Sequence, residues 1–109
     1  MFAKIPEIQV GEFRELVGKK PLIIDVSDND VFERTHVPHA TNVPLKELLK
    51  DPQTYLTKEA YLICETGKKS KKAVTKLFQT YPMHWVKGGT VVYGRRFPLI
   101  RQQKLKEKA

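Results

Sequence analysis

One short stretch of the chain, CETGKKS at residues 64–70, combines residue types that suit nucleophilic chemistry on an anion. It holds Cys64, the single cysteine of the chain, followed closely by a glycine and two lysines. A thiolate is a strong nucleophile, and a helix start or nearby lysines favour the thiolate form. The alternative is that Cys64 is a small buried apolar residue, as lone cysteines often are. The elements around the stretch must decide between these two interpretations.

Short apolar runs alternate with amphipathic segments along the chain, which is the pattern of strands separated by crossover helices. The expected strands or extended segments are 21–26, 40–44, 60–64 and 84–87, and the expected helices are 30–35, 45–50 and 70–81. The longest helix rests on apolar residues that recur on one helix face, and Pro82 is expected to end it. The sequence therefore predicts an α/β fold.

This pattern gives the CETGKKS stretch a place in the fold. It leaves the carboxyl end of the strand 60–64 and enters a helix at about Ser70. In open α/β sheets ligands bind at that edge, where the next helix presents unpaired N–H groups and the positive end of its dipole. Gly67 permits a positive φ, so that the loop amides can point toward one sulfur. Lys68 and Lys69 add positive charge for an anionic substrate.

The same residues resemble the single-domain rhodaneses, a family of sulfurtransferases whose active loop often reads Cys-x-x-Gly-x-Arg-Ser. Cys64, Gly67 and Ser70 match that loop, with a lysine at the arginine position. Three further segments are similar to family motifs in the same order: Asp25-Val26 after an early strand, THVPHATNVP at 35–44, and Gly88-Gly89 with Tyr93. The resemblance covers about residues 20–98.

The resemblance implies a rhodanese-like single domain with a central, mostly parallel sheet flanked by helices on both faces. It also implies a sulfurtransferase in which Cys64 carries sulfane sulfur as a persulfide, without a cofactor or metal. The donor would be a small anion such as thiosulfate, and the acceptor a thiol, a cyanide-type nucleophile or a protein partner in a sulfur relay. Cys64 is the expected catalytic residue, and the expected substrate-binding residues are Glu65, Thr66, Gly67, Lys68, Lys69 and Ser70.

Several positions depart from the family pattern. Ser27 and Val31 stand where many members have an arginine and a glutamate that resemble an ion pair, and Thr35 and His39 replace the two glycines that flank His36. Glu65, directly after the cysteine, would repel thiosulfate if its side chain pointed inward. Either Glu65 faces solvent, or the natural donor is another molecule, such as a protein persulfide.

The same residues allow a comparison with other classes of protein. A cysteine phosphatase of this fold needs an arginine six residues after the cysteine to bind phosphate bidentately, and that position is Ser70. A rhodanese-like binding or regulatory module, or a relay carrier with little turnover of small donors, is the stronger rival. Asp25 and His36 are expected to hold backbone turns rather than to take part in chemistry.

The bulk properties are those of one small domain. The chain has 109 residues, and we expect a rhodanese-like domain at 1–100 with a basic, flexible tail at 101–109. The net charge of +8 allows an anionic partner, but the lysines are spread and no arginine-rich run occurs, so we expect no nucleic-acid partner. With no long apolar stretch at the N-terminus and one cysteine, we expect a cytoplasmic monomer without a membrane span.

Overall fold

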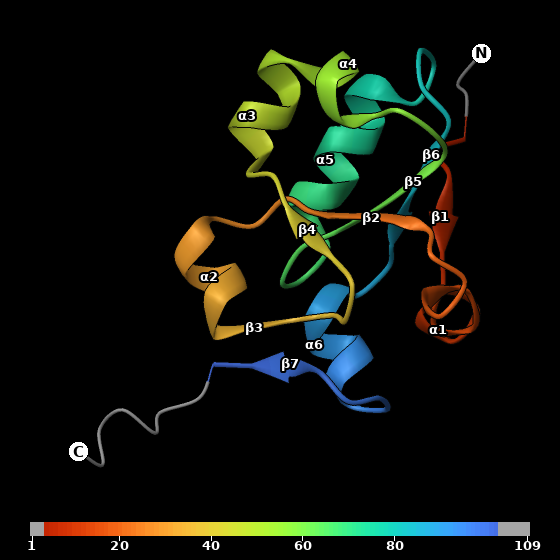
Figure 1. Ribbon diagram of the computed structural model, residues 1–109. Coiled ribbons are helices and arrows are strands. Elements are labelled where there is room, and N and C mark those ends of the chain that lie inside the picture. Colours follow the sequence, from red (N-terminus) through yellow and green to blue (C-terminus); the bar gives the residue numbers. More distant parts are fainter. Residues whose placement is uncertain (1–3, 103–109) are drawn as a thin grey trace.

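The structure is a computed structural model that describes residues 4–102, and its centre is a parallel β-sheet (Figure 1). The strands of this sheet are β1 (Glu7–Ile8), β2 (Leu22–Asp25), β4 (Thr41–Asn42), β5 (Ala60–Ile63) and β6 (Met83–Val86), in the order β1-β6-β5-β2-β4. Each neighbouring pair is parallel. The predicted α/β fold with a central parallel sheet is therefore confirmed.

Helices cover both faces of the sheet, as predicted. They are α1 (Val10–Val17), α2 (Asn29–Arg34), α3 (Leu45–Lys50), α4 (Pro52–Tyr55), α5 (Lys68–Leu77) and α6 (Gly89–Gly94). Figure 1 shows α3, α4 and α5 gathered on one side of the sheet and α1 and α6 on the other. The carboxyl ends of β2 and β5 point toward the space between α2, α5 and α6.

The central strands are apolar on both faces because each face is buried under helices. Ile24 and Leu62 belong to the core cluster that includes residues of α3 and α5. Their neighbours Ile23 and Ile63 belong to the opposite cluster, which includes residues of α1 and α6. Successive side chains of a strand point to opposite faces, so a strand buried on both sides is a continuous apolar run. This accounts for the runs that predicted the two central strands.

The long helix differs from its predicted bounds. It begins at Lys68 instead of Ser70, because Gly67 takes the left-handed conformation at the N-cap, with φ 98°. It ends at Leu77 instead of Tyr81, and the amides of Thr80 and Tyr81 both donate to the Leu77 carbonyl. The residue before a proline avoids the helical region, so the chain tightens into a turn before Pro82.

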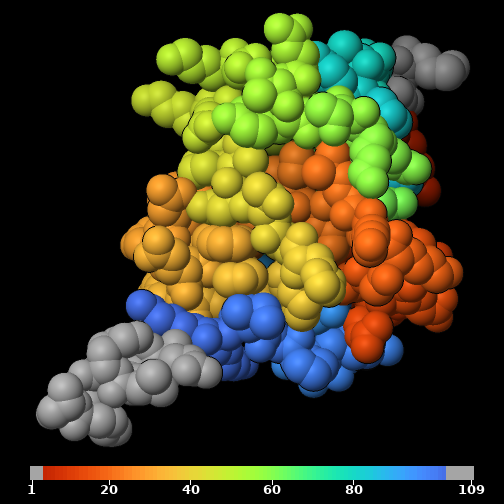
Figure 2. All heavy atoms as spheres, in the orientation of Figure 1, coloured from red at the N-terminus to blue at the C-terminus, as the bar shows by residue number. Residues whose placement is uncertain are grey.

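A second, two-stranded sheet pairs β3 (Thr35–His36) with β7 (Ile100–Arg101) in antiparallel fashion. The amide of Gln102 also donates to the Arg34 carbonyl. In Figure 2 the blue C-terminal segment lies directly against the orange segment that holds α2 and β3. The expected flexible tail at 101–109 thus starts within β7, and its residues 103–109 lie outside the described part of the chain.

The turn after β3 keeps a glycine-type backbone without its glycines. His39 has a positive φ of 72°, in the left-handed region where a glycine would normally be found. Thr35 is extended, with φ −165°, so the loss of a glycine there costs no backbone strain. The amide of Ala40 closes the turn on the Val37 carbonyl at 3.2 Å. The replacements therefore leave the path of the chain intact.

Candidate active site

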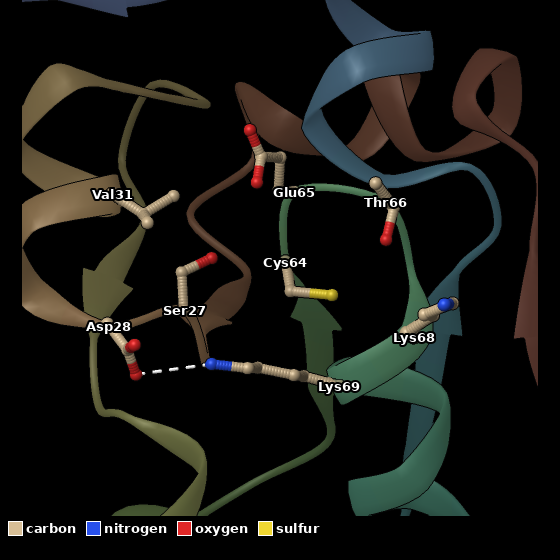
Figure 3. Close-up of a pocket in the computed structure, with 8 residues that line it drawn as sticks. All are labelled: Ser27, Asp28, Val31, Cys64, Glu65, Thr66, Lys68 and Lys69. Carbon is tan, nitrogen blue, oxygen red and sulfur yellow. Dashed lines mark hydrogen bonds and ion pairs between the residues drawn. The ribbon is translucent and has the colours of Figure 1, made fainter.

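Cys64 lies directly after β5, at the carboxyl edge of the sheet, and it lines a hollow of about 190 Å³. Its neighbours in the lining come from two regions, the end of β2 with α2 and the loop into α5. They are Ser27, Asp28, Val31, Glu65, Thr66, Lys68 and Lys69 (Figure 3). Only 3% of the Cys64 surface is exposed. The sulfur is therefore accessible only to molecules that enter this hollow.

The sulfur of Cys64 accepts hydrogen bonds from the loop that follows it. The amide of Gly67 donates to Sγ at 3.2 Å and the amide of Ser70 at 3.4 Å, while the Ser70 hydroxyl lies 3.6 Å from Sγ. The Ser70 hydroxyl also donates to the Gly67 carbonyl at 3.2 Å, which holds the first turn of α5. Amides at a helix N-terminus carry partial positive charge. Such a cradle stabilises a thiolate, or an added sulfur that bears negative charge.

The loop is held from behind by the start of α6. The amide of Thr90 donates to the Cys64 carbonyl at 2.9 Å, and the amide of Val91 donates to the Glu65 carbonyl at 3.0 Å. Gly88 and Gly89 both have positive φ, 88° and 65°. A Cβ on Gly89 would lie 2.3 Å from the Cys64 carbonyl oxygen. The Gly-Gly pair is needed here both for its backbone conformation and for this close approach.

The lysines of the loop differ in how they are placed. Lys69 forms an ion pair with Asp28 across the hollow, with 3.1 Å between Nζ and Oδ1 (Figure 3). Both partners are well exposed, so the pair contributes little to stability. Lys68 lines the hollow and, among the described residues, has no ion-pair partner. Its charge is therefore available to an anion near the sulfur.

Glu65 is exposed, and Figure 3 shows its carboxylate turned toward Val31 and away from the sulfur. The Glu65 carboxylate therefore does not lie against the sulfur, although Glu65 lines the hollow (Figure 3). Its carboxylate instead borders the side of the hollow next to α2.

The wall opposite the loop was not assigned to the site from sequence. Ser27, Asp28 and Val31 line the hollow with Cys64, although more than thirty residues separate them along the chain. β2 and β5 are adjacent parallel strands, so the residues that follow them meet at one edge. The prediction of two parallel strands at 21–26 and 60–64 could have indicated that the residues after both strands share one site. Ser27 and Val31, noted above as departures from the family pattern, lie at that edge of the sheet.

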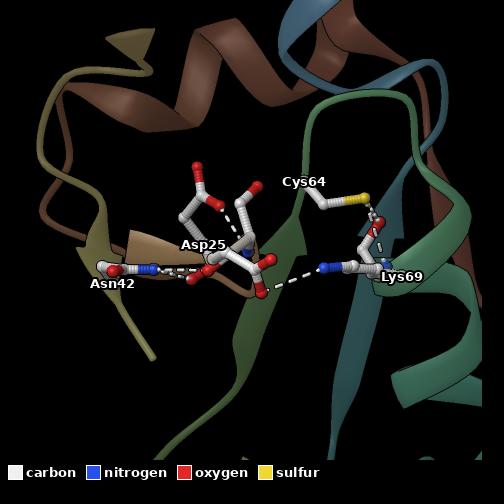
Figure 4. Close-up of polar contacts among 7 residues, drawn as sticks. Asp25, Asn42, Cys64 and Lys69 are labelled. Carbon is white, nitrogen blue, oxygen red and sulfur yellow. Dashed lines mark hydrogen bonds and ion pairs between the residues drawn. The ribbon is translucent and has the colours of Figure 1, made fainter. Parts of the chain in front are cut away.

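Asp25 and His36 act on the backbone, as expected. The Asp25 carboxylate accepts from the Ser27 amide at 2.9 Å, and the Asn42 side chain donates to the Asp25 and Ser27 carbonyls, each at 2.9 Å (Figure 4). His36 donates through Nδ1 to the Phe32 carbonyl at 2.7 Å and stacks on the Phe32 ring. These contacts fix the turn that carries Ser27 into the hollow.

Asp25 is 1% exposed, and burial raises the pKa of its carboxyl above the usual range. Hydrogen bonds from Ser27 and the proximity of His36 lower the pKa but do not cancel the effect of burial.

Within residues 4–102, no group of three or more His, Cys, Asp or Glu side chains could hold a metal ion. None of the helices described is long and apolar enough to cross a membrane.

Fold and site together define a class: a small parallel α/β domain with one cysteine at the sheet edge, whose sulfur accepts hydrogen bonds from amides at a helix start. The family model of the rhodanese-like domain matches residues 9–95. The chain belongs to the rhodanese-like domain family.

Curated relatives point to sulfur transfer. The chain is 33% identical over 98 residues to "Adenylyltransferase and sulfurtransferase MOCS3" of Drosophila sechellia, covering 80% of this chain and 21% of that protein. It is 31% identical over 74 residues to "Putative sulfur carrier protein YrkF" of Bacillus subtilis, covering 65% of this chain and 40% of that protein. The chain thus spans about a fifth to two fifths of the length of these relatives.

Solved structures share the fold. A rhodanese-related protein of Thermoplasma volcanium superposes with a TM-score of 0.79 at 22% identity, covering 90% of this chain and 99% of the other. A thiosulfate sulfurtransferase of Pseudomonas aeruginosa also gives a TM-score of 0.79, at 18% identity, covering 91% of this chain and 21% of the other. At these identities the likeness establishes the rhodanese-like fold.

The Gly-Gly turn makes a direct prediction. Gly89→Ala should destabilise the domain by about 1–3 kcal/mol from the backbone conformation alone, and the clash with the Cys64 carbonyl adds to that loss. Gly18→Ala is the matched control, because a Cβ there meets nothing within 4 Å and its φ is −79°. The control should gain about 0.4–1 kcal/mol. Urea unfolding measures both, and equal midpoints for the two variants would contradict the close approach.

Asp25 makes a prediction about pH. Because its pKa is raised on folding, the native state binds more protons than the unfolded state above about pH 4, and stability falls as pH rises through the folded pKa. Asp25→Asn keeps an oxygen for the Ser27 amide and removes this effect. The stability of the variant relative to wild type should therefore rise between pH 4 and neutrality, by at most about 1.4 kcal/mol per pH unit. A difference independent of pH, in denaturant melts across that range, would refute the argument.

Proposed function

We propose that the domain is a sulfurtransferase that moves sulfane sulfur from a small donor such as thiosulfate to a thiophilic acceptor through a Cys64 persulfide. The observation that carries this proposal is the sulfur of Cys64, which lines a hollow and accepts hydrogen bonds from the Gly67 and Ser70 amides at the start of α5. A buried packing cysteine has no need of that arrangement. The relatives whose names include sulfurtransferase and sulfur carrier support the same chemistry.

In the first step the Cys64 thiolate attacks the outer sulfur of thiosulfate. A new S–S bond forms to Sγ, the S–S bond of thiosulfate breaks, and sulfite leaves with the bonding electron pair. The terminal sulfur of the persulfide keeps one negative charge, so no proton or external reductant is needed. The amides that donate to Sγ stabilise the thiolate before the attack, and amides of the same loop would stabilise the charge on the outer sulfur in the way an oxyanion hole does.

The charges around the hollow support a small anionic donor. Lys68 and Lys69 line the hollow beside Thr66, and Lys68 has no ion-pair partner among residues 4–102. The Glu65 carboxylate lies away from the sulfur (Figure 3). A dianion that approaches from the side of α5 therefore meets the lysines before it meets the glutamate.

The test is the intact mass of the protein after incubation with thiosulfate and removal of excess reagent. The wild type should become one sulfur atom heavier, and Cys64→Ser should not, because the chain has no other thiol. A wild type that stays at its original mass with every sulfane donor would favour the rhodanese-like binding or regulatory module instead.

A protein-to-protein sulfur relay is the second candidate, and the lysines of α5 favour it. This ten-residue helix carries Lys68, Lys69, Lys71, Lys72 and Lys76 and no acidic residue. All five lysines are exposed, and they form a basic surface beside the Cys64 hollow. An acidic partner protein would be steered to such a surface. The relay predicts full loading of Cys64 but slow steady-state turnover of thiosulfate with cyanide, and turnover as fast as loading would contradict it.

A further inference from the structure

A second hollow of about 200 Å³ adjoins the Cys64 hollow. Ser27, Val31 and Glu65 line both. The other walls of the second hollow come from Thr35 of β3, from α6 and from Arg101 of β7. A molecule seated in the second hollow is therefore separated from the Cys64 hollow only by the residues that line both.

The passage between the two hollows depends on small side chains. Ser27 and Val31 line both hollows, and both are short and uncharged. Long charged side chains at these two positions would take up space between the hollows.

The second hollow carries opposite charges on its wall. Glu65 and Arg101 are both exposed, and neither forms an ion pair within the part of the chain that the structure describes. A carboxylate and a guanidinium that line one hollow complement a ligand that is itself a zwitterion.

The size of the hollow limits the ligand. Pockets for drug-sized molecules measure about 300–1,000 Å³, so a hollow of about 200 Å³ takes a smaller molecule. An amino acid is of the right class, with an ammonium group for Glu65 and a carboxylate for Arg101. A bidentate contact from a guanidinium suits that carboxylate.

We propose that the second hollow binds the amino-acid end of a small zwitterionic thiol, and that this thiol is the acceptor of the sulfur carried on Cys64. The proposal rests on the persulfide function above. The ammonium group lies at Glu65, the carboxylate at Arg101, and the thiol group reaches past Ser27 to the persulfide. Glu65, beside the nucleophile, thus serves to select the acceptor.

The transfer step balances without an added reagent. The acceptor thiol gives its proton to the outer sulfur of the Cys64 persulfide anion, and the resulting thiolate attacks that sulfur. A new S–S bond forms on the acceptor, and the bond from Sγ to the outer sulfur breaks. The electron pair of that bond stays on Sγ, which leaves as the thiolate under the Gly67 and Ser70 amides. The proton remains on the outer sulfur, so the products are a low-molecular-weight persulfide and free Cys64.

The experiment compares three thiols as acceptors of sulfur from loaded wild-type protein. L-cysteine carries both charged groups, cysteamine lacks the carboxylate, and 3-mercaptopropionate lacks the ammonium group. Rates of loss of the extra sulfur mass are compared at equal thiolate concentration, which removes differences in thiolate fraction, and are divided by the rate of each thiol with a small persulfide in solution, which removes differences in nucleophilicity. L-cysteine should discharge the protein at least about tenfold faster than either truncated thiol, which corresponds to about 1.4 kcal/mol. Equal rates for the three thiols would overturn the proposal.

Two variants locate the effect. Arg101→Gln should bring the rate ratio of L-cysteine to cysteamine close to one, and Glu65→Gln should do the same for L-cysteine against 3-mercaptopropionate. Arg95→Gln is the matched control, an exposed arginine that lines neither hollow. Ratios that stay at the wild-type value in Arg101→Gln and Glu65→Gln would also overturn the proposal.

A binding measurement separates this proposal from the persulfide function. S-methyl-L-cysteine cannot accept sulfur through a thiolate, and its binding to unloaded protein can be followed by NMR chemical shifts. Saturable binding that Arg101→Gln weakens and Arg95→Gln does not supports the site, even in a protein that never loads with sulfur. In that case the failure belongs to the persulfide function. Binding that is absent from the wild type, or unchanged in Arg101→Gln, overturns the site.

Discussion

Two hydrogen bonds from the start of α6 to the loop after β5 are the constraint on which the rest of the site depends. They run from the Thr90 and Val91 amides to the Cys64 and Glu65 carbonyls. Each bond satisfies one amide at the start of α6, which has no partner within the helix, and one carbonyl of the loop that follows β5. Once the loop is held there, the Gly67 and Ser70 amides face the sulfur. Cys64 is thus positioned by α6, the helix that follows the next strand of the sheet.

The elements that the sequence revealed are those whose pattern is strong within a few residues. β2 up to Ile24 and β5 form apolar runs because both faces of these strands are buried, and α5 repeats its apolar residues on one face. α1 was missed although Val10, Phe13 and Val17 are buried at helical spacing, a signal that was present in the sequence. α6 had no such signal, since it starts with a glycine and holds two adjacent valines, which are poor helix formers.

β4 lies within the predicted extended segment 40–44, but β3 and β7 could not be found from local patterns. β3 and β7 have two residues each, and their pairing joins segments that lie far apart in the sequence. Their stability comes from the tertiary structure, which no window of the sequence contains. The same reason limited the prediction of the site from sequence. The loop from Cys64 to Ser70 is continuous in the sequence, whereas Ser27 and Arg101 reach the hollows only because of where the fold places the end of β2 and β7.

The burial of Cys64 has a consequence for what the domain can carry. A disulfide brings two sulfur atoms to about 2.05 Å with the backbones close together. Cys64 is only 3% exposed and its sulfur lies within a hollow, so the sulfurs of two copies of the chain cannot come close enough to form a disulfide. A persulfide is a reactive group that many thiols and oxidants would consume in bulk water. If Cys64 carries the sulfur as proposed, the hollow around it would limit which molecules can reach that sulfur and unload it.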